Sequence, residues 1–167
     1  MMRAIVLGLL VSALPQLGLA ACKELPLGET EGSFIGAVMT RMAATGVGDF
    51  FPTKTDANGF RMYVLIGSDV RVIVRCDGGL LQEVRTLIGE PTTAETDRLF
   101  TAAAFSIARF SDVTEADAKS ELYAMLDATN RDGKKMAGKL LGGLFVDVQR
   151  PGDGTAIIAQ IGKCASD

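Results

Sequence analysis

The sequence predicts an α+β domain with a mostly antiparallel sheet of about five strands and helices packed on one face. Two observations lead to this prediction. Segments with the two-residue alternation of β-strands are joined by short turns rich in Gly, Asn and Asp. Longer segments with apolar residues at helical spacing separate these strands. The expected order is α-β-β-β-α-α-β-β, and 167 residues suffice for one domain with its own core.

The first expected helix begins at Ser33, which can cap it, and ends near Ala44. Residues 49–59 are expected to form a loop that ends in the turn signal Asn58-Gly59. Two strands then follow, Phe60–Ile66 and Val70–Cys76, because both segments alternate between apolar and polar residues.

The register of these two strands depends on the length of the loop between them. A three-residue loop, Gly67-Ser68-Asp69, makes Phe60 face Cys76 and makes every facing pair apolar. A two-residue loop would put Arg71 and Arg75 on the face of Met62, which costs burial of charge. The three-residue loop is therefore the prediction.

The segment Leu80–Ile88 fits either a helix or a strand. Its apolar residues have helical spacing, but it is short and follows the turn Asp77-Gly78-Gly79. We expect a strand that completes a meander and ends before Glu90-Pro91.

Two helices are expected next. Thr92 and Glu95 form a capping box that opens a helix to about Phe110, with an apolar middle typical of a buried helix. Thr114 begins another helix, and residues 131–139 are a basic segment that could continue it. The strands Gly143–Arg150 and Thr155–Gly162 then flank a strong hairpin signal, residues 151–154.

The N-terminus has the layout of a secretory signal. Met1–Arg3 is a short positive region, Ala4–Leu14 is apolar, and Pro15-Gln16 interrupts the apolar run before small residues follow. A transmembrane helix needs about 20 predominantly apolar residues, so we expect export and not a spanning anchor.

The end of this signal, Leu19-Ala20-Ala21-Cys22, resembles the lipobox of bacterial lipoproteins. The resemblance implies that the Cys22 thiol receives a diacylglyceryl group and that residues 1–21 are removed. Lys23, in place of Asp, then implies the outer membrane, with the domain facing the periplasm. Ordinary cleavage before Ala21 would instead give a free periplasmic protein with an exposed Cys22.

Three segments are therefore expected: a cleaved signal (1–21), a lipidated cysteine with a polar tether (22–32) and a single α+β domain (33–167). Removing residues 1–21 takes away one charged residue, Arg3, and changes the formal charge from −3 to −4. An acidic domain has no electrostatic attraction to nucleic acid, so no nucleic-acid partner is expected.

The cysteine count agrees with lipidation. If Cys22 carries lipid, Cys76 and Cys164 remain and are expected to pair in an oxidising periplasm. The strands that carry them must then end near each other. The alternative is that both are small buried apolar side chains. We expect no metal site and no cofactor, because the chain has no histidine and no Cys-x-x-Cys.

The absence of histidine also excludes Ser-His-Asp and Cys-His catalysis. The carboxylates Asp112, Glu115 and Asp117 cluster as a glycoside-hydrolysing pair would, although helix N-termini attract acids for dipole reasons alone. Ser120 and Lys119 are adjacent on a helix and do not face each other.

Residues 133–140 match seven of the eight positions of a phosphate-binding loop, but Leu140 replaces the hydroxyl that would hold Mg²⁺. No nucleotide site is expected. The cations of this region fit a solvated helix end, or contact with anionic lipid headgroups; they are Arg131, Lys134, Lys135 and Lys139.

Four arginines of the first three strands form the candidate binding face, with Glu83 among them: Arg61, Arg71, Arg75 and Arg85. In the predicted register Arg61 lies opposite Arg75, which costs energy unless an acidic group offsets it. Solvated edge charges are the alternative. The leading hypothesis is a lipid-anchored, non-catalytic envelope protein that binds another envelope component. A small histidine-free envelope hydrolase is the alternative.

Overall fold

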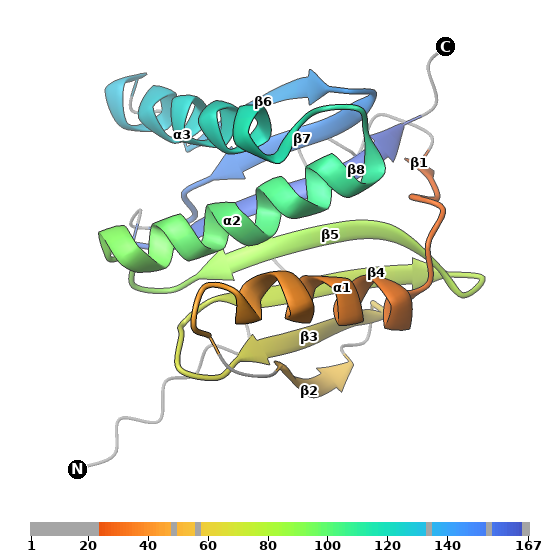
Figure 1. The fold of residues 1–167 in the computed structure, drawn as a ribbon. Helices are drawn as coiled ribbons and strands as arrows, with labels where there is room; N and C mark the ends of the chain where they lie inside the picture. Colours follow the sequence, from red (N-terminus) through yellow and green to blue (C-terminus); the bar gives the residue numbers. More distant parts are fainter. Residues whose placement is uncertain (1–23, 48–49, 56–57, 133–134, 153–154, 165–167) are drawn as a thin grey trace.

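The computed structural model describes residues 24–47, 50–55, 58–132, 135–152 and 155–164. Three helices of these residues lie on one face of an antiparallel sheet (Figure 1), which confirms the predicted α+β class. In the described part of the chain, seven strands follow the order β2-β3-β4-β5-β8-β7-β6, and the short β1 pairs with β8. The elements are β1 (Glu24–Leu25), α1 (Glu31–Ala43), β2 (Phe50–Thr55), β3 (Phe60–Leu65), β4 (Arg71–Asp77), β5 (Leu80–Ile88), α2 (Thr93–Phe110), α3 (Glu115–Asp132), β6 (Met136–Leu141), β7 (Leu144–Gln149) and β8 (Ile157–Cys164).

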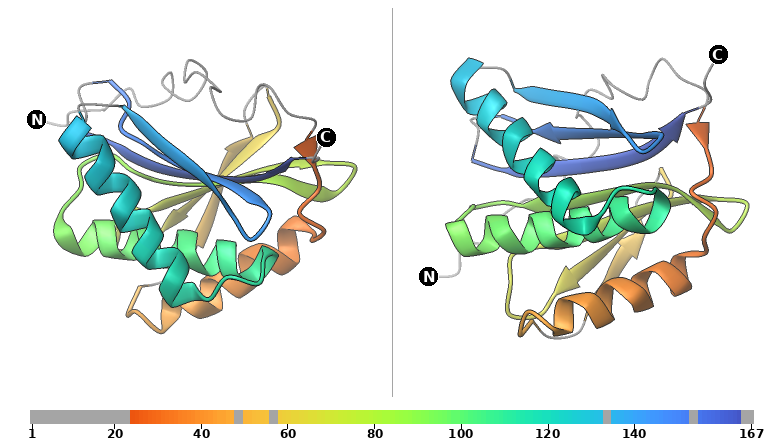
Figure 2. Two further views of the ribbon diagram at one scale, coloured as in Figure 1. Left: turned by 90° about the horizontal axis from the view of Figure 1, so that it is seen from above. Right: turned by 45° about the horizontal axis from the view of Figure 1, so that its top comes forward.

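The helices form one layer over the sheet, as both views in Figure 2 show. α2 packs on the central strands β5 and β8, α3 packs on β6 and β7, and α1 lies beside α2. Phe34, Phe100 and Leu122, one from each helix, are fully buried in the core between the layers. Each such side chain contributes about 1.5 to 3 kcal/mol by leaving water.

Thr92 and Thr114 cap the last two helices as predicted. The Thr92 hydroxyl accepts the Glu95 backbone N–H at 3.2 Å, and the Thr114 hydroxyl accepts that of Asp117 at 3.1 Å. The Glu95 carboxylate, however, accepts hydrogen bonds from Ser68 and from the Asp69 N–H, instead of from the Thr92 N–H as the predicted capping box requires. α1 begins at Glu31, two residues before the predicted start.

The strand prediction for Leu80–Ile88 is confirmed, with these bounds. The turn before β5 is a two-residue hairpin, Gly78-Gly79, in which φ is 57° and 83°. Positive φ at both central positions is the geometry that Gly-Gly allows in a two-residue turn. The β4–β5 register then shifts between Arg75 and Cys76, which leaves Gln82 as the extra residue of a bulge.

Three strands were not predicted, and the short β1 lies in the segment expected to be a tether. β2 lies in the segment expected to be a loop, and β6 lies in the segment that could continue a helix. Both are terminal strands of the sheet, where only one edge needs a partner and the apolar alternation is weak. β6 is specified instead by its hairpin with β7, closed by Gly142-Gly143 at φ 53° and 78°.

The predicted register of β3 and β4 is wrong. Phe60 lies opposite Arg75 and Met62 opposite Ile73, which is a shift of one residue. The loop has four residues, 66–69, and is closed by a bond of 3.2 Å from the Leu65 N–H to the Val70 carbonyl. The arginines of β4 therefore share a face with Met62, an arrangement that we expected to cost too much.

Residues 24–29 are part of the folded domain and not a free tether. Glu24 and Leu25 pair with Cys164 and Lys163 of β8. The Leu27 N–H donates to the Leu81 carbonyl at 2.7 Å, and the Leu81 N–H donates to the Glu29 carbonyl at 2.8 Å. Glu24, two residues after Cys22 in the sequence, thus already belongs to the sheet.

Candidate functional site on the helix-free face

The sheet face that points away from the three described helices is here called the helix-free face. Its described residues include five buried polar side chains: Glu83, Arg85, Asp147, Gln149 and Gln160. The strand registers align its side chains in three rows that run from β3 to β6. The rows are Phe60, Arg75, Glu83, Gly162, Phe145 and Leu140; Met62, Ile73, Arg85, Gln160, Asp147 and Gly138; and Val64, Arg71, Leu87, Ile158, Gln149 and Met136.

A buried ion network occupies the middle of this face. The Glu83 side chain is only 1% exposed and accepts hydrogen bonds from the Nε atoms of Arg85 and Arg75, the latter at 3.4 Å. Arg75 also pairs with Glu24 of β1. Charges at this depth are tolerated only when they are paired, and Glu83 supplies a shared anion between two guanidinium groups.

Phe60 supplies a second kind of compensation. The Cζ atoms of Arg85 and Arg75 lie 4.5 and 5.6 Å from the centre of its ring. Cations at these distances are attracted by the electron-rich ring face. The observed register creates this arrangement, since it brings Phe60 opposite Arg75.

Asp147 is a buried carboxyl group beside this network. Its Oδ1 accepts a hydrogen bond of 2.8 Å from Gln149, whose amide also reaches the Gln160 carbonyl oxygen at 3.3 Å. Its Oδ2 is buried without a hydrogen-bond partner in the described structure. Burial raises the pKa of Asp147 to about 6, although the Gln149 hydrogen bond and the charge of Arg85 act in the opposite direction.

Gly138 lies beside Asp147 on β6. A Cβ atom at Gly138 would lie 3.1 Å from the Cβ of Asp147 and 3.3 Å from the Val146 carbonyl oxygen. A glycine therefore lets the edge strand approach the carboxyl group closely.

An apolar cluster completes the face, and it consists of the buried Phe60, Ile73, Leu87 and Ile158 with the half-buried Met62 and Ala156. Arg71 lies at its border between Val64 and Leu87. The Arg71 side chain is half-buried and forms no ion pair within the described part of the chain.

Three of the four predicted binding arginines share this face: Arg71, Arg75 and Arg85. Arg61 lies opposite Val74, with its side chain on the helix side, where it pairs with Glu31 of α1 at 3.0 Å. The expected pair of Arg61 with Arg75 is wrong because it depended on the predicted register. Arg75 and Arg85 belong to the buried network, whereas Arg71 forms no ion pair with any described residue.

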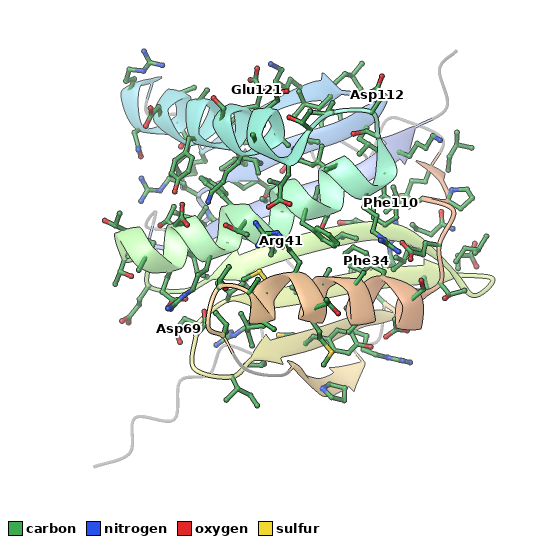
Figure 3. All side chains as sticks on the ribbon, in the orientation of Figure 1. Phe34, Arg41, Asp69, Phe110, Asp112 and Glu121 are labelled. Atoms are coloured by element: carbon green, nitrogen blue, oxygen red, sulfur yellow. The ribbon has the colours of Figure 1, made fainter. Side chains whose placement is uncertain are left out.

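Two of the three carboxylates considered for the hydrolase alternative, Glu115 and Asp117, form contacts that stabilise the helices. Glu115 pairs with Arg41 of α1, whose side chain extends toward α2 in Figure 3, with Nε–O distances of 3.0 and 3.1 Å. Asp117 accepts a hydrogen bond of 2.7 Å from Thr114. Asp112 lies near Gly142, at the turn between β6 and β7.

The sheet order separates the two cysteines that were expected to pair. Cys76 is a free, half-buried thiol whose pKa is raised by burial. β4 and β8 stop at the same end of the sheet, as expected, but β5 lies between them. Two strand spacings amount to about 10 Å, beyond the reach of a disulfide. The side chain of Cys164, like all of Cys22, lies outside the described part.

Lysines of the basic segment 131–139, and Lys119 of the Ser120–Lys119 pair, also form contacts within the fold. Residues 136–140 form a strand, so they are not a phosphate-binding loop. Lys139 pairs with Glu121 at 2.8 Å, and Lys135 donates to the Gly152 carbonyl at 3.1 Å. Lys119 pairs with Asp97 at 2.7 Å. Lys134 lies outside the described part.

Sequence reasoning missed Asp147, Gln149 and Gln160. A signal was present, because these polar residues stand at alternate positions of two otherwise apolar strands. Such positions indicate a sheet face with polar partners, but they do not identify the partners.

Neither a metal centre nor a membrane-spanning helix is found in the described residues. No group of three or more His, Cys, Asp and Glu side chains among them could hold a metal ion. None of the described helices is long and apolar enough to cross a bilayer. No protein-family model matches the chain, and no curated protein or solved structure matches it.

Proposed function

We propose that the chain is an exported, lipid-anchored protein of the bacterial cell envelope whose α+β domain binds another envelope protein. Anchoring at the outer membrane, with the domain in the periplasm, is supported by the lipobox resemblance of Leu19-Ala20-Ala21-Cys22 and by Lys23 after it. Two or three lipid chains hold a protein on a bilayer durably, since each buried methylene contributes about 0.8 kcal/mol.

The binding role rests on one observation, the helix-free face. The helices of the described residues lie on the other face of the sheet (Figure 2), and the helix-free face carries the half-buried apolar side chains of Met62 and Ala156. Arg71, on the same face, forms no ion pair with a described residue. Arg75, Arg85 and Glu83 are buried and mutually paired, so we assign them the role of fixing the shape of the face. A partner with an apolar surface and an acidic group fits this arrangement.

A photo-crosslinking amino acid at Arg71 tests the binding role in intact envelopes. Arg131 is the matched control, because it is an exposed arginine on α3, on the other side of the sheet. We expect one discrete protein adduct from position 71 and none from position 131. Equal labelling from both positions, or none from either, would contradict the proposal.

The anchor has a separate test, the mass of the mature N-terminus. A diacylglyceryl group on Cys22 supports anchoring, whereas an unmodified start at Ala21 leaves a free periplasmic protein. The hydrolase alternative has less support, because Glu115 and Asp117 are occupied in an ion pair and a helix cap.

A further inference from the structure

We propose that one end of the sheet, called the anchored end, rests on the bilayer and places Leu80 and Leu140 in its interface. The anchored end consists of β1, the C-terminal end of β8 and the hairpin turns β4–β5 and β6–β7. The inference rests on the proposed lipid anchor at Cys22, and it specifies which part of the domain touches lipid.

The first step is the reach of the anchor. Only Lys23 separates Cys22 from β1, and two extended residues span at most about 7 Å. The following residues have no slack, because Glu24 and Leu25 pair with β8 and Leu27 is hydrogen-bonded to Leu81. A lipid on Cys22 therefore holds this end of the sheet at the membrane surface.

The second step is what the registers bring to this end. The Cys164 end of β8 lies beside the start of β5 and the start of β7. The turns Gly78-Gly79 and Gly142-Gly143 therefore stand at the same end as β1, on the right-hand side of Figure 1. Both turns are uncharged glycine pairs, but the exposed Asp77 directly precedes the first turn and the exposed Asp112 lies beside the second. The turns themselves can approach lipid without burying an ion, provided that these two carboxylates stay in the hydrated headgroup layer.

The third step is the exposed apolar side chains. Leu80 follows one turn directly and is 36% exposed, and Leu140 lies two residues before the other turn and is 69% exposed. The half-buried Leu25, which pairs with Lys163 of β8, and the exposed Pro26 after it belong to the same end. These side chains can leave water by entering the interface, which is favourable for apolar surface.

The charged residues at this end determine whether contact with the bilayer requires anionic headgroups. Among the described residues of this end, Asp77, Asp112 and Lys163 are exposed, and the exposed Lys139 is paired with Glu121. These residues form no basic cluster that would select anionic headgroups. Lys135 stands at the opposite end of β6, away from the anchor. Contact is therefore driven by apolar burial, and vesicles of zwitterionic phosphatidylcholine should support it.

The chain contains no tryptophan, so a single introduced tryptophan reports its own environment. Three variants of the full-length, lipidated protein suit the test: Leu80→Trp, Leu140→Trp and the control Ile66→Trp. Ile66 is 42% exposed and lies in the β3–β4 loop, at the far end of the sheet. Each variant is reconstituted into phosphatidylcholine vesicles with and without brominated acyl chains.

We expect a blue shift and bromine quenching for Leu80→Trp and Leu140→Trp, and neither effect for Ile66→Trp. Quenching at position 66 alone, at all three positions or at none would overturn the orientation. Leu140→Trp alone carries the test if Leu80→Trp fails to fold. The mass of Cys22 is measured on the same samples: an unmodified Cys22 defeats the proposed anchor, whereas a lipidated Cys22 with unquenched tryptophans defeats the orientation only.

Discussion

At the scale of single residues, the helix-free face contains both a carboxylate that is fully paired, Glu83, and one that is only partly hydrogen-bonded, Asp147. Glu83 is shared by two arginines, and Phe60 accepts both guanidinium groups on its ring. Asp147 has one hydrogen-bonded oxygen and one without a partner. The buried environment therefore disfavours ionisation of Asp147.

This gives a pH prediction. The pKa of Asp147 is raised from 3.8 to about 6, so the folded state binds its proton more tightly than the unfolded state does. The stabilisation is full below about pH 4 and is lost as the pH rises through about 6, a change of about 3 kcal/mol. In Asp147→Asn this change should be absent. Urea unfolding of both proteins between about pH 4 and 7 measures it.

The comparison has an internal control. The pKa values of Glu29 and Asp97 are lowered, chiefly by their hydrogen bonds to Arg109 and Lys119. Those carboxylates stabilise the fold above their unfolded pKa and lose that effect on acidification. Their contribution is the same in both proteins and cancels in the difference. Parallel stability curves for the two proteins would refute the role of Asp147.

At the scale of elements, predictability followed the strength of the local pattern. The helix starts at Thr92 and Thr114 were predictable because a cap and a following acid mark them. The β3–β4 register was not, because the choice depended on charge compensation by Glu83, Glu24 and Phe60, which no local pattern reveals. The local argument against placing Arg71 and Arg75 on the face of Met62 failed because contacts with distant residues compensate the buried charge.

The turn between β6 and β7 shows how closely the elements fit. A Cβ at Gly142 would lie 2.6 Å from the Cβ of Ser111 in the connection between α2 and α3, and φ is 53°. A Cβ at Gly143 meets nothing within 4 Å, although φ there is 78°. Substitution of either glycine thus strains a backbone with positive φ, but only at Gly142 does the added Cβ also clash with a neighbouring side chain.

We expect both Gly142→Ala and Gly143→Ala to lose about 1 to 2 kcal/mol through the left-handed backbone. Gly142→Ala should lose at least about 1 kcal/mol more, because the new methyl group displaces Ser111. Chemical denaturation of the unsubstituted protein and of both variants measures these losses in the free energy of unfolding. Equal losses would mean that the turn does not rest on the α2–α3 connection as described.

At the scale of the whole molecule, the sheet order determines which distant segments meet. The class and the single helical layer were predictable from alternating strands and helical spacing, but the insertion of β8 beside β5 was not, since no local feature encodes it. That insertion places β5 between Cys76 and Cys164 and removes the expected bridge.

The thiol of Cys76 is therefore expected to remain free in the mature protein. After denaturation without reductant, alkylation should modify Cys76, and peptide mass spectrometry should find the modified peptide. A sample reduced before alkylation is the reference for complete labelling. Detection of a peptide pair joined through Cys76 and Cys164 would contradict the strand order near this end.

The pairing of β1 with β8 also bears on the order of folding. Among the described residues β1 is the first strand and β8 the last, so nearly all of the described chain lies between these partners. A contact of such separation forms late, after the intervening segments have reduced the entropy of closing the loop. Glu24 and Leu25 can therefore pair only after the C-terminal strand β8 is available. A chain anchored through Cys22 would already be held at the membrane before its sheet is complete.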